Sequence, residues 1–108
     1  MSDFTSKLKF DNIVPGLDLA TYISGPVEVQ VVKVKSGAEI PLHKHTDDVV
    51  HLILEGEITF SDGGTVGPLA DYRCGRFEYQ GVAKSDTTML IIQPVGTTFE
   101  FIDKPLAD

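Results

Sequence analysis

GAEIPLHKHTDDVVHLILEGE, residues 37–57, contains all three histidines of the chain: His43, His45 and His51. Residues i and i+2 of a β-strand project from the same face. His43 and His45 should therefore point the same way, close enough to bind one divalent ion, and His51 has the same parity if the strand runs unbroken. Imidazole is a common ligand of Zn, Cu, Fe and Ni. The alternative is a pair of solvated histidines on an edge strand.

Short β-type runs surround this stretch on both sides. Val27–Lys35 alternates apolar with polar residues, and its phase slips at Val31–Val32, which predicts a β-bulge. Val49–Leu54 is almost continuously apolar, as expected of a strand buried on both faces. The other expected strands are Glu57–Phe60, Phe77–Val82, Thr87–Gln93 and Thr97–Ile102.

Turn-forming residues separate these runs, since the chain has 10 Gly and 6 Pro. Asp62-Gly63-Gly64 predicts a hairpin because these residues tolerate a positive φ. Lys84-Ser85-Asp86 is expected to close a second hairpin. Asp18–Ile23 could form one helical turn, but no segment shows sustained helical periodicity. Many short strands with Gly-rich turns predict an all-β sandwich or barrel.

Size, charge and cysteine content narrow the possible functions. The 108 residues correspond to one domain, and the net charge of −7 disfavours binding to nucleic acid phosphates. The single cysteine, Cys74, cannot form an internal disulfide. No apolar stretch approaches the roughly 20 residues of a membrane-spanning helix. We therefore expect a cytoplasmic protein that binds neither nucleic acid nor membrane.

The histidine stretch resembles the first sequence motif of the cupin superfamily. That motif reads glycine, five residues, His-x-His, three or four residues, glutamate, six residues, glycine. Gly37, His43, His45 and Gly56 stand at its positions, and the Leu-Glu-Gly-Glu ending is also typical of cupins. The resemblance covers roughly Val27 to Gln93. It implies a cupin-type double-stranded β-helix, a jelly-roll barrel with a metal site in its interior.

One position of this motif departs from the family pattern. The glutamate position falls on Val49, or on Val50 with the longer spacing, and neither side chain can bind a metal. Some cupins lack this glutamate, among them the diketone-cleaving dioxygenases. The resemblance therefore implies a metal-dependent enzyme acting on a small molecule, with a dioxygenase-like reaction favoured over an isomerase, lyase or cyclase. The alternative is a cupin that binds or senses a small ligand without turnover.

The second cupin motif is matched less well. With Gly67 and Gly75 at its glycine positions, Arg73 replaces the proline, Glu78 the histidine and Val82 the asparagine.

Two other registers of the second motif put Asp86 or Lys84 in the histidine position. Both would consume the second expected hairpin, so Glu78 is preferred. If the neighbouring aromatic residues Phe77 and Tyr79 face the core, however, Glu78 faces water.

The expected metal ligands are therefore His43, His45 and Glu78, with His51 as a possible fourth ligand or a buried polar residue. Two histidines and one carboxylate are the ligand set of non-haem Fe(II) oxygenases, and with Zn the same set can activate water. The identity of the divalent ion (Fe, Zn, Ni or Mn) is left open. Asp47 shares the parity of His45 but is expected on a solvated bend.

The chain is expected to form one cupin domain over residues 1–108. It divides into an N-terminal extension at 1–26, a barrel core at 27–93, and a C-terminal strand and tail at 94–108. The family resemblance implies a homodimer, often with an N-terminal strand that crosses to the partner subunit. Residues 12–23 could lie in that connection.

Overall fold

The computed structural model describes residues 8–46, 49–60, 64–68, 71–74 and 79–102, with the backbone alone for 71–74 and 79. Every regular element among these residues is a β-strand, which confirms the all-β prediction. None of the described segments forms a helix long and apolar enough to cross a membrane.

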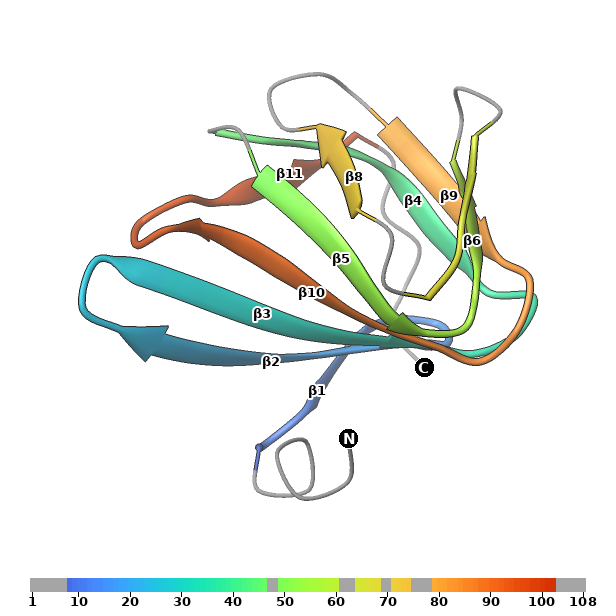
Figure 1. The fold of residues 1–108 in the computed structure, drawn as a ribbon, viewed down its shortest axis with the longest axis horizontal. Coiled ribbons are helices and arrows are strands. Elements are labelled where there is room, and N and C mark those ends of the chain that lie inside the picture. Colours follow the sequence, from blue (N-terminus) through green and yellow to red (C-terminus); the bar gives the residue numbers. More distant parts are fainter. Residues whose placement is uncertain (1–7, 47–48, 61–63, 69–70, 75–78, 103–108) are drawn as a thin grey trace.

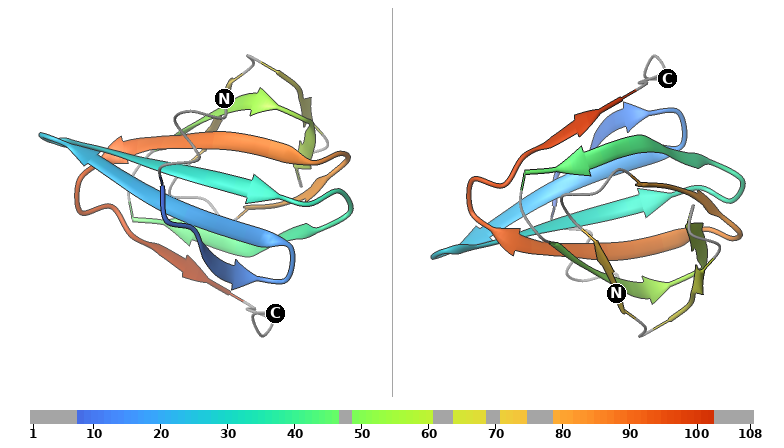
Figure 2. Two further views of the ribbon diagram at one scale, coloured as in Figure 1. Left: turned by 90° about the horizontal axis from the view of Figure 1, so that it is seen from below. Right: turned by 90° about the horizontal axis from the view of Figure 1, so that it is seen from above.

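In the described part of the chain, eleven strands form two antiparallel sheets that face each other (Figures 1 and 2). The six-stranded sheet consists, in spatial order, of β1 (Asp11–Val14), β2 (Leu17–Ser24), β3 (Val27–Val34), β10 (Thr87–Pro94), β5 (Val49–Glu55) and β8 (Asp71–Cys74). The five-stranded sheet consists of β11 (Phe99–Phe101), β4 (Glu39–His45), β9 (Tyr79–Ala83), β6 (Ile58–Phe60) and β7 (Thr65–Val66). Figure 2 shows β4 and β11 on one side of the molecule, and β5 and β10 on the other.

The hydrophobic core fills the space between the sheets. Alternate residues of each strand point inward, because successive side chains of a strand leave opposite faces. Val32 of β3 and Met89 of β10 do so from the six-stranded sheet, and Ile40 of β4 and Phe60 of β6 from the five-stranded sheet; all are buried in one cluster. This core holds β4 and β5 on opposite walls of the interior.

The backbone conformation and the close packing after β5 explain why position 56, the last glycine of the histidine stretch, is a glycine. Gly56 follows β5 with φ = 89°, a backbone conformation that disfavours side chains. A Cβ at this position would collide with the backbone of Asp86 and Thr87 where β10 begins. The glycine thus allows the turn after β5 to pack against the start of β10.

The N-terminal part of the chain is more regular than expected. Residues 18–23 form part of β2, so the expected helical turn there is wrong. β2 pairs along its whole length with β3 of the same chain, from Leu17↔Val34 to Ser24↔Val27. Much of the segment 1–26, expected as an extension from the barrel, thus contributes two strands to the chain's own sheet.

The turn at Lys84-Ser85-Asp86 does not close a hairpin. β9 pairs with β4 and β6 in one sheet, whereas β10 pairs with β3 and β5 in the other. The turn therefore carries the chain from one sheet to the other, a difference that turn residues alone do not reveal. The reason for preferring Glu78 over the other registers of the second motif is thereby lost. β6 and β7, on either side of the expected hairpin turn, pair antiparallel, while Asp62 and Gly63 of that turn lie outside the described residues.

The expected bulge at Val31–Val32 is absent, because β3 pairs with β2 and β10 in an unbroken register. The phase slip has another cause. Gln30 and Val32 both line the interior, so Val31 lies on the outer face although it is fully buried. The polar residues of the first half of β3 thus face inward.

Candidate metal centre and barrel cavity

His43 and His45 lie side by side on the inner face of β4. Both are buried, with 5% and 4% of their surface exposed, whereas Lys44 between them is exposed. Their ring centres are 5.2 Å apart in an edge-on arrangement. The i, i+2 spacing therefore produces the predicted pair on one face of a strand.

His51 reaches the same interior from the opposite sheet. It lies on β5, is fully buried, and its ring centre is 6.1 Å from that of His45 and 5.8 Å from that of Phe60. The strand does not run unbroken from His45, since β4 ends there and β5 begins at Val49. The parity argument for His51 is therefore wrong in its reason, although the side chain does point inward.

Two phenylalanines flank the histidine pair. Phe99 and Phe101 of β11 are the register partners of His45 and His43. The ring centre of Phe99 is 5.9 Å from that of His45, and the ring centre of Phe101 is 5.7 Å from that of His43. These aromatic rings contribute an apolar surface beside the imidazoles.

The tautomer of His43 is fixed by its neighbour in the chain. The Nδ1 atom lies 2.7 Å from the carbonyl oxygen of Pro41. A carbonyl oxygen only accepts hydrogen bonds, so Nδ1 carries the proton and donates it. The neutral ring then keeps a lone pair on Nε2, which is the arrangement found in most metal-binding histidines.

Burial keeps the histidine pair uncharged. Desolvation is the main cause that lowers the pKa of His45 to about 3, and the neighbouring His43 and His51 contribute to this value because adjacent imidazolium ions repel each other. Desolvation also lowers the pKa of His43, against the opposing effect of its hydrogen bond to Pro41. Neutral imidazole is the form that binds metals.

The spacing of the rings fits one ion between His43 and His45. Each Zn–N bond is about 2.0 Å long, so two imidazoles on one ion have ring centres within roughly 6 Å of each other. The His43–His45 separation meets this limit, and the His45–His51 separation lies at it. Within the described part of the chain, no three His, Cys, Asp or Glu side chains converge as a metal site. The residues present fit a two-histidine site that needs a further ligand.

The other sequence candidates lie elsewhere. Glu78 and Asp47 fall outside the described residues, as does the side chain of Cys74. Lys84 and Asp86 are exposed on the turn between β9 and β10, where the Asp86 carboxylate accepts a hydrogen bond from the backbone N–H of Ser36 at 2.9 Å. Neither lines the histidine cavity.

The three histidines line a small cavity inside the barrel, of about 30 Å³. A volume of this order holds one water-sized group. Apart from the histidines and Gln30, the lining is apolar, namely Ile13, Leu17, Leu19, Val32, Ile40, Met89, Ile91, Phe99 and Phe101. A metal ion or a small polar group fits here.

Three polar residues that are buried in this interior were not predicted from the sequence. Glu28, Gln30 and Gln93 are buried, and Gln30 lines the histidine cavity. In the sequence, Glu28 and Gln30 read as the solvent-facing residues of an alternating strand. The phase slip after them was the available signal that the faces are reversed.

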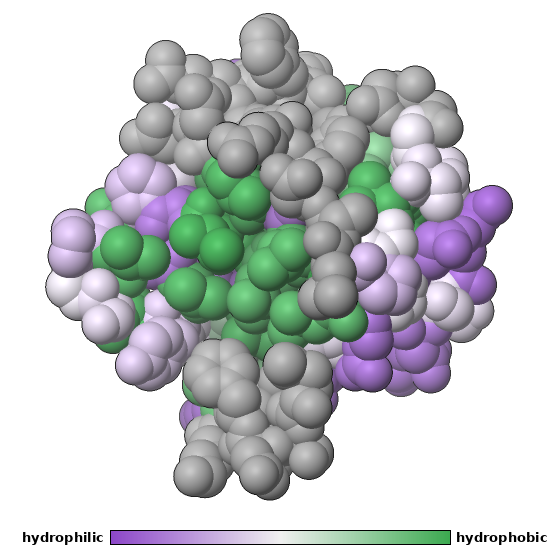
Figure 3. All heavy atoms as spheres, viewed as in Figure 1, coloured by the Kyte–Doolittle hydropathy of each residue, from purple (hydrophilic) through white to green (hydrophobic). Residues whose placement is uncertain are grey.

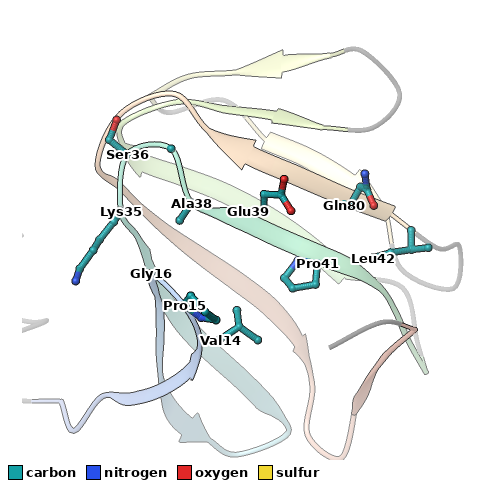
Figure 4. Close-up of a pocket in the computed structure, with 11 residues that line it drawn as sticks. Val14, Pro15, Gly16, Lys35, Ser36, Ala38, Glu39, Pro41, Leu42 and Gln80 are labelled. Carbon is teal, nitrogen blue, oxygen red and sulfur yellow. The ribbon is translucent and has the colours of Figure 1, made fainter. Parts of the chain in front are cut away.

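A larger hollow, of about 810 Å³, is a groove on the outside of the described part of the chain (Figure 4). It lies between the turn at Pro15 and Gly16, the turn between β3 and β4, and residues of β4 and β9 such as Glu39 and Gln80. No histidine lines it. The histidines predicted as metal ligands therefore line the smaller inner cavity and not this groove.

Neither a protein-family model nor a curated protein sequence matches the chain. Solved structures, in contrast, are similar to it. A chain of the complex of Rhodobacter sphaeroides SigE with the anti-sigma ChrR has a TM-score of 0.74 and 17% identity, over 85% of this chain and 55% of that one. The present chain thus spans little more than half the length of that relative.

Two further structures are similar over most of their length. An RmlC-like cupin from Shewanella frigidimarina has a TM-score of 0.72 and 16% identity, over 82% of this chain and 85% of that one. The polyketide cyclase RemF from Streptomyces resistomycificus has a TM-score of 0.71 and 16% identity, over 91% and 82%. These similarities confirm the predicted fold, the cupin-type double-stranded β-helix.

Proposed function

We propose that this chain, which has the cupin fold, holds a divalent metal ion on His43 and His45 and uses it to act on a small molecule, with a dioxygenase-like reaction. The observation that carries the proposal is the hydrogen bond from His43 Nδ1 to the Pro41 carbonyl. It presets a neutral imidazole whose lone pair is on Nε2, next to a second buried and uncharged imidazole. Fe, Zn, Ni and Mn all remain candidates.

The chain's own residues would prepare this site in three ways. The Pro41 carbonyl orients His43, burial keeps both rings neutral, and Phe99 with Phe101 limits the access of water. A bound metal would act as a Lewis acid on a coordinated oxygen. His51, which lines the same cavity, is proposed as a third ligand, and Glu78 as the alternative or fourth ligand.

A second function is favoured by the size of the cavity. Ligand pockets usually have volumes of about 300–1,000 Å³, whereas the inner cavity measures about 30 Å³. A cavity this small leaves no room for a substrate of ordinary size, which favours a module that binds or senses a ligand of about the size of water without turnover. The similarity to a chain of the SigE–ChrR complex supports this alternative, because that structure is a protein–protein complex.

The metal content of protein purified without a histidine tag tests the first proposal. Elemental mass spectrometry should find close to one Fe, Zn, Ni or Mn per chain. The double variant His43→Ala/His45→Ala should lose this metal and retain its fold by circular dichroism, whereas the control Lys44→Ala should keep it. Stoichiometric metal in the folded double variant would exclude the histidine pair as the site.

The same measurement assigns the remaining ligands. Glu78→Gln should lower metal affinity if Glu78 completes the site. If Glu78→Gln leaves the metal affinity unchanged, His51→Ala should lower it. If neither variant changes the metal affinity, neither residue is a ligand.

Once metal is found, candidate small molecules can be tested for turnover. Oxygen consumption with such a substrate would favour the dioxygenase reaction. Saturable binding without turnover would favour the sensing module.

We also propose that the protein is a cytoplasmic homodimer whose subunits meet on the outer face of the six-stranded sheet. Apolar side chains gather on this face over β3, β10 and β5 (Figure 3). Ile92, for example, is exposed there. A small barrel gains stability by covering such a face.

Light scattering should give twice the chain mass for the wild type. Ile92→Lys should shift the protein toward the monomer, because it would bury a charge in the interface. Ile102→Lys, another exposed apolar position, is the control and should not. A wild-type mass of one chain would refute the dimer.

A further inference from the structure

Three buried polar side chains form a second polar group inside the barrel, on the six-stranded sheet. Glu28 and Gln30 are two residues apart on β3, and Gln93 is the register partner of Glu28 on β10. Their exposed fractions are 9%, 6% and 3%. We call Glu28, Gln30 and Gln93 the acceptor wall.

The hydrogen bonds within this wall fix the orientation of both amides. Gln93 Nε2 donates to Glu28 Oε2 at 2.5 Å, and Gln30 Nε2 lies at 3.5 Å from the same oxygen. Because a carboxylate only accepts, each amide must turn its NH₂ group toward Glu28 and its oxygen away. Both amide oxygens are buried, and neither has a hydrogen-bond partner within the described part of the chain.

The wall therefore presents oxygen acceptors without a matching donor. Glu28 forms no ion pair with any Lys, Arg or His among the described residues, although its carboxyl group is largely buried. A buried acceptor without a partner costs free energy, and a buried carboxylate without a countercharge costs more. The complementary ligand group is a hydrogen-bond donor with a positive charge.

The volume of the cavity limits the size of this ligand group. Gln30 lines the same cavity of about 30 Å³ as the three histidines, where Leu19 and Phe99 are among the apolar neighbours. The volume accommodates a water-sized head group such as –NH₃⁺. Aromatic rings near the head group can add a cation–π attraction.

From these observations we infer that the acceptor wall binds the ammonium group of a very small primary amine of one or two carbons, whose carbon atoms lie against the aliphatic and aromatic lining. The inference rests on the proposed use of this cavity as a ligand site, and it names the class of molecule that enters. It assigns Glu28 and Gln30 to ligand recognition and leaves the metal to the histidines.

Two-dimensional NMR of the chelator-treated protein at pH 7, titrated with methylammonium chloride, tests this inference. The amine should cause saturable shifts that include residues of β3 and β10, whereas methanol, of similar size but uncharged, should bind at least about tenfold more weakly.

Glu28→Gln should weaken amine binding by at least about tenfold, since it removes the charged acceptor. Gln30→Met, which removes one amide oxygen at similar volume, should weaken it severalfold and keeps the test valid if Glu28→Gln does not fold. The exposed Glu39→Gln is the matched control and should bind the amine like the wild type.

Absence of saturable amine binding to the wild type would overturn the inference and leave the two amide oxygens to a trapped water. Equal affinity in a folded Gln30→Met or Glu28→Gln variant would overturn it as well. Zinc titration of the same samples separates the two proposals. Zinc binding without amine binding refutes only the acceptor wall, and amine binding without zinc binding refutes only the metal site.

Discussion

The interior of this barrel has two polar walls, and each reduces the free-energy cost of burying its polar side chains in a different way. In the histidine wall, formed by His43, His45 and His51, the rings of His43 and His45 become neutral, because desolvation lowers their pKa values. The acceptor wall cannot do this with its two amides, which do not titrate, and it satisfies their NH₂ groups on Glu28 instead. In our proposals, the first wall would bind a metal through imidazole nitrogens, and the second would bind a hydrogen-bond donor through amide and carboxylate oxygens.

This contrast teaches which experiments separate the walls. A change of pH acts on imidazoles and leaves amides untouched, whereas removal of an amide changes hydrogen bonding without changing the charge. The two walls can therefore be perturbed one at a time in the same folded protein. The larger effect is expected at the histidine wall.

Acid should destabilise the metal-free protein through His45. The pKa of His45 is about 3 in the folded chain and about 6.5 when unfolded, so between these values only the unfolded chain takes up the proton. The contribution of neutral His45 to the free energy of unfolding is therefore complete above about pH 6.5, and it falls as the pH decreases toward 3. From pH 7 to pH 5 the loss from this residue should be about 2 kcal/mol, measured by urea unfolding.

The matched variants sharpen this result. His45→Gln should remove most of the pH dependence assigned to His45, whereas Gln93→Leu on the other wall should keep it. An unchanged acid dependence in His45→Gln would show that burial of this imidazole does not control stability in that pH range.

Much of the histidine wall could be predicted from sequence because its signal is local. The His-x-His spacing on a strand dictates a shared face, and the structure confirms that His43 and His45 share it. The inward position of His51 depended on where the chain passes from one sheet to the other, which spacing does not encode. The cupin fold followed from the spacing of glycines and histidines, one of which, Gly56, is required by the close approach of β10.

The acceptor wall could not be predicted because its signal is tertiary. Alternation on β3 shows that two faces differ, but it does not show which face is inside. Val31 is buried on the outer face, so apolar residues occupy both faces and the usual assignment fails. The pairing of Glu28 with Gln93 joins residues 65 positions apart, beyond any local pattern. The same limit explains the wrong hairpin at 84–86, where consecutive strands enter different sheets.

A smaller effect distinguishes the two amides of the acceptor wall. Gln93→Leu should destabilise the protein by about 1 kcal/mol, since it removes the short hydrogen bond to Glu28 but also an amide oxygen that has no partner in the described chain. Gln30→Met should cost less, about 0.5 kcal/mol or below, because its 3.5 Å contact is at the limit of a hydrogen bond. Urea unfolding at pH 7 measures both values.

The order of these two values tests how the wall is built. If Gln93 is the main hydrogen-bond donor to Glu28, the Gln93→Leu variant leaves the buried carboxyl group without that donor. The loss of stability in Gln93→Leu must then exceed the loss in Gln30→Met. The reverse order would mean that Gln30 holds the carboxyl instead. Its oxygen would then be turned toward the cavity more firmly than that of Gln93, and the ligand contact would depend on Gln30 alone.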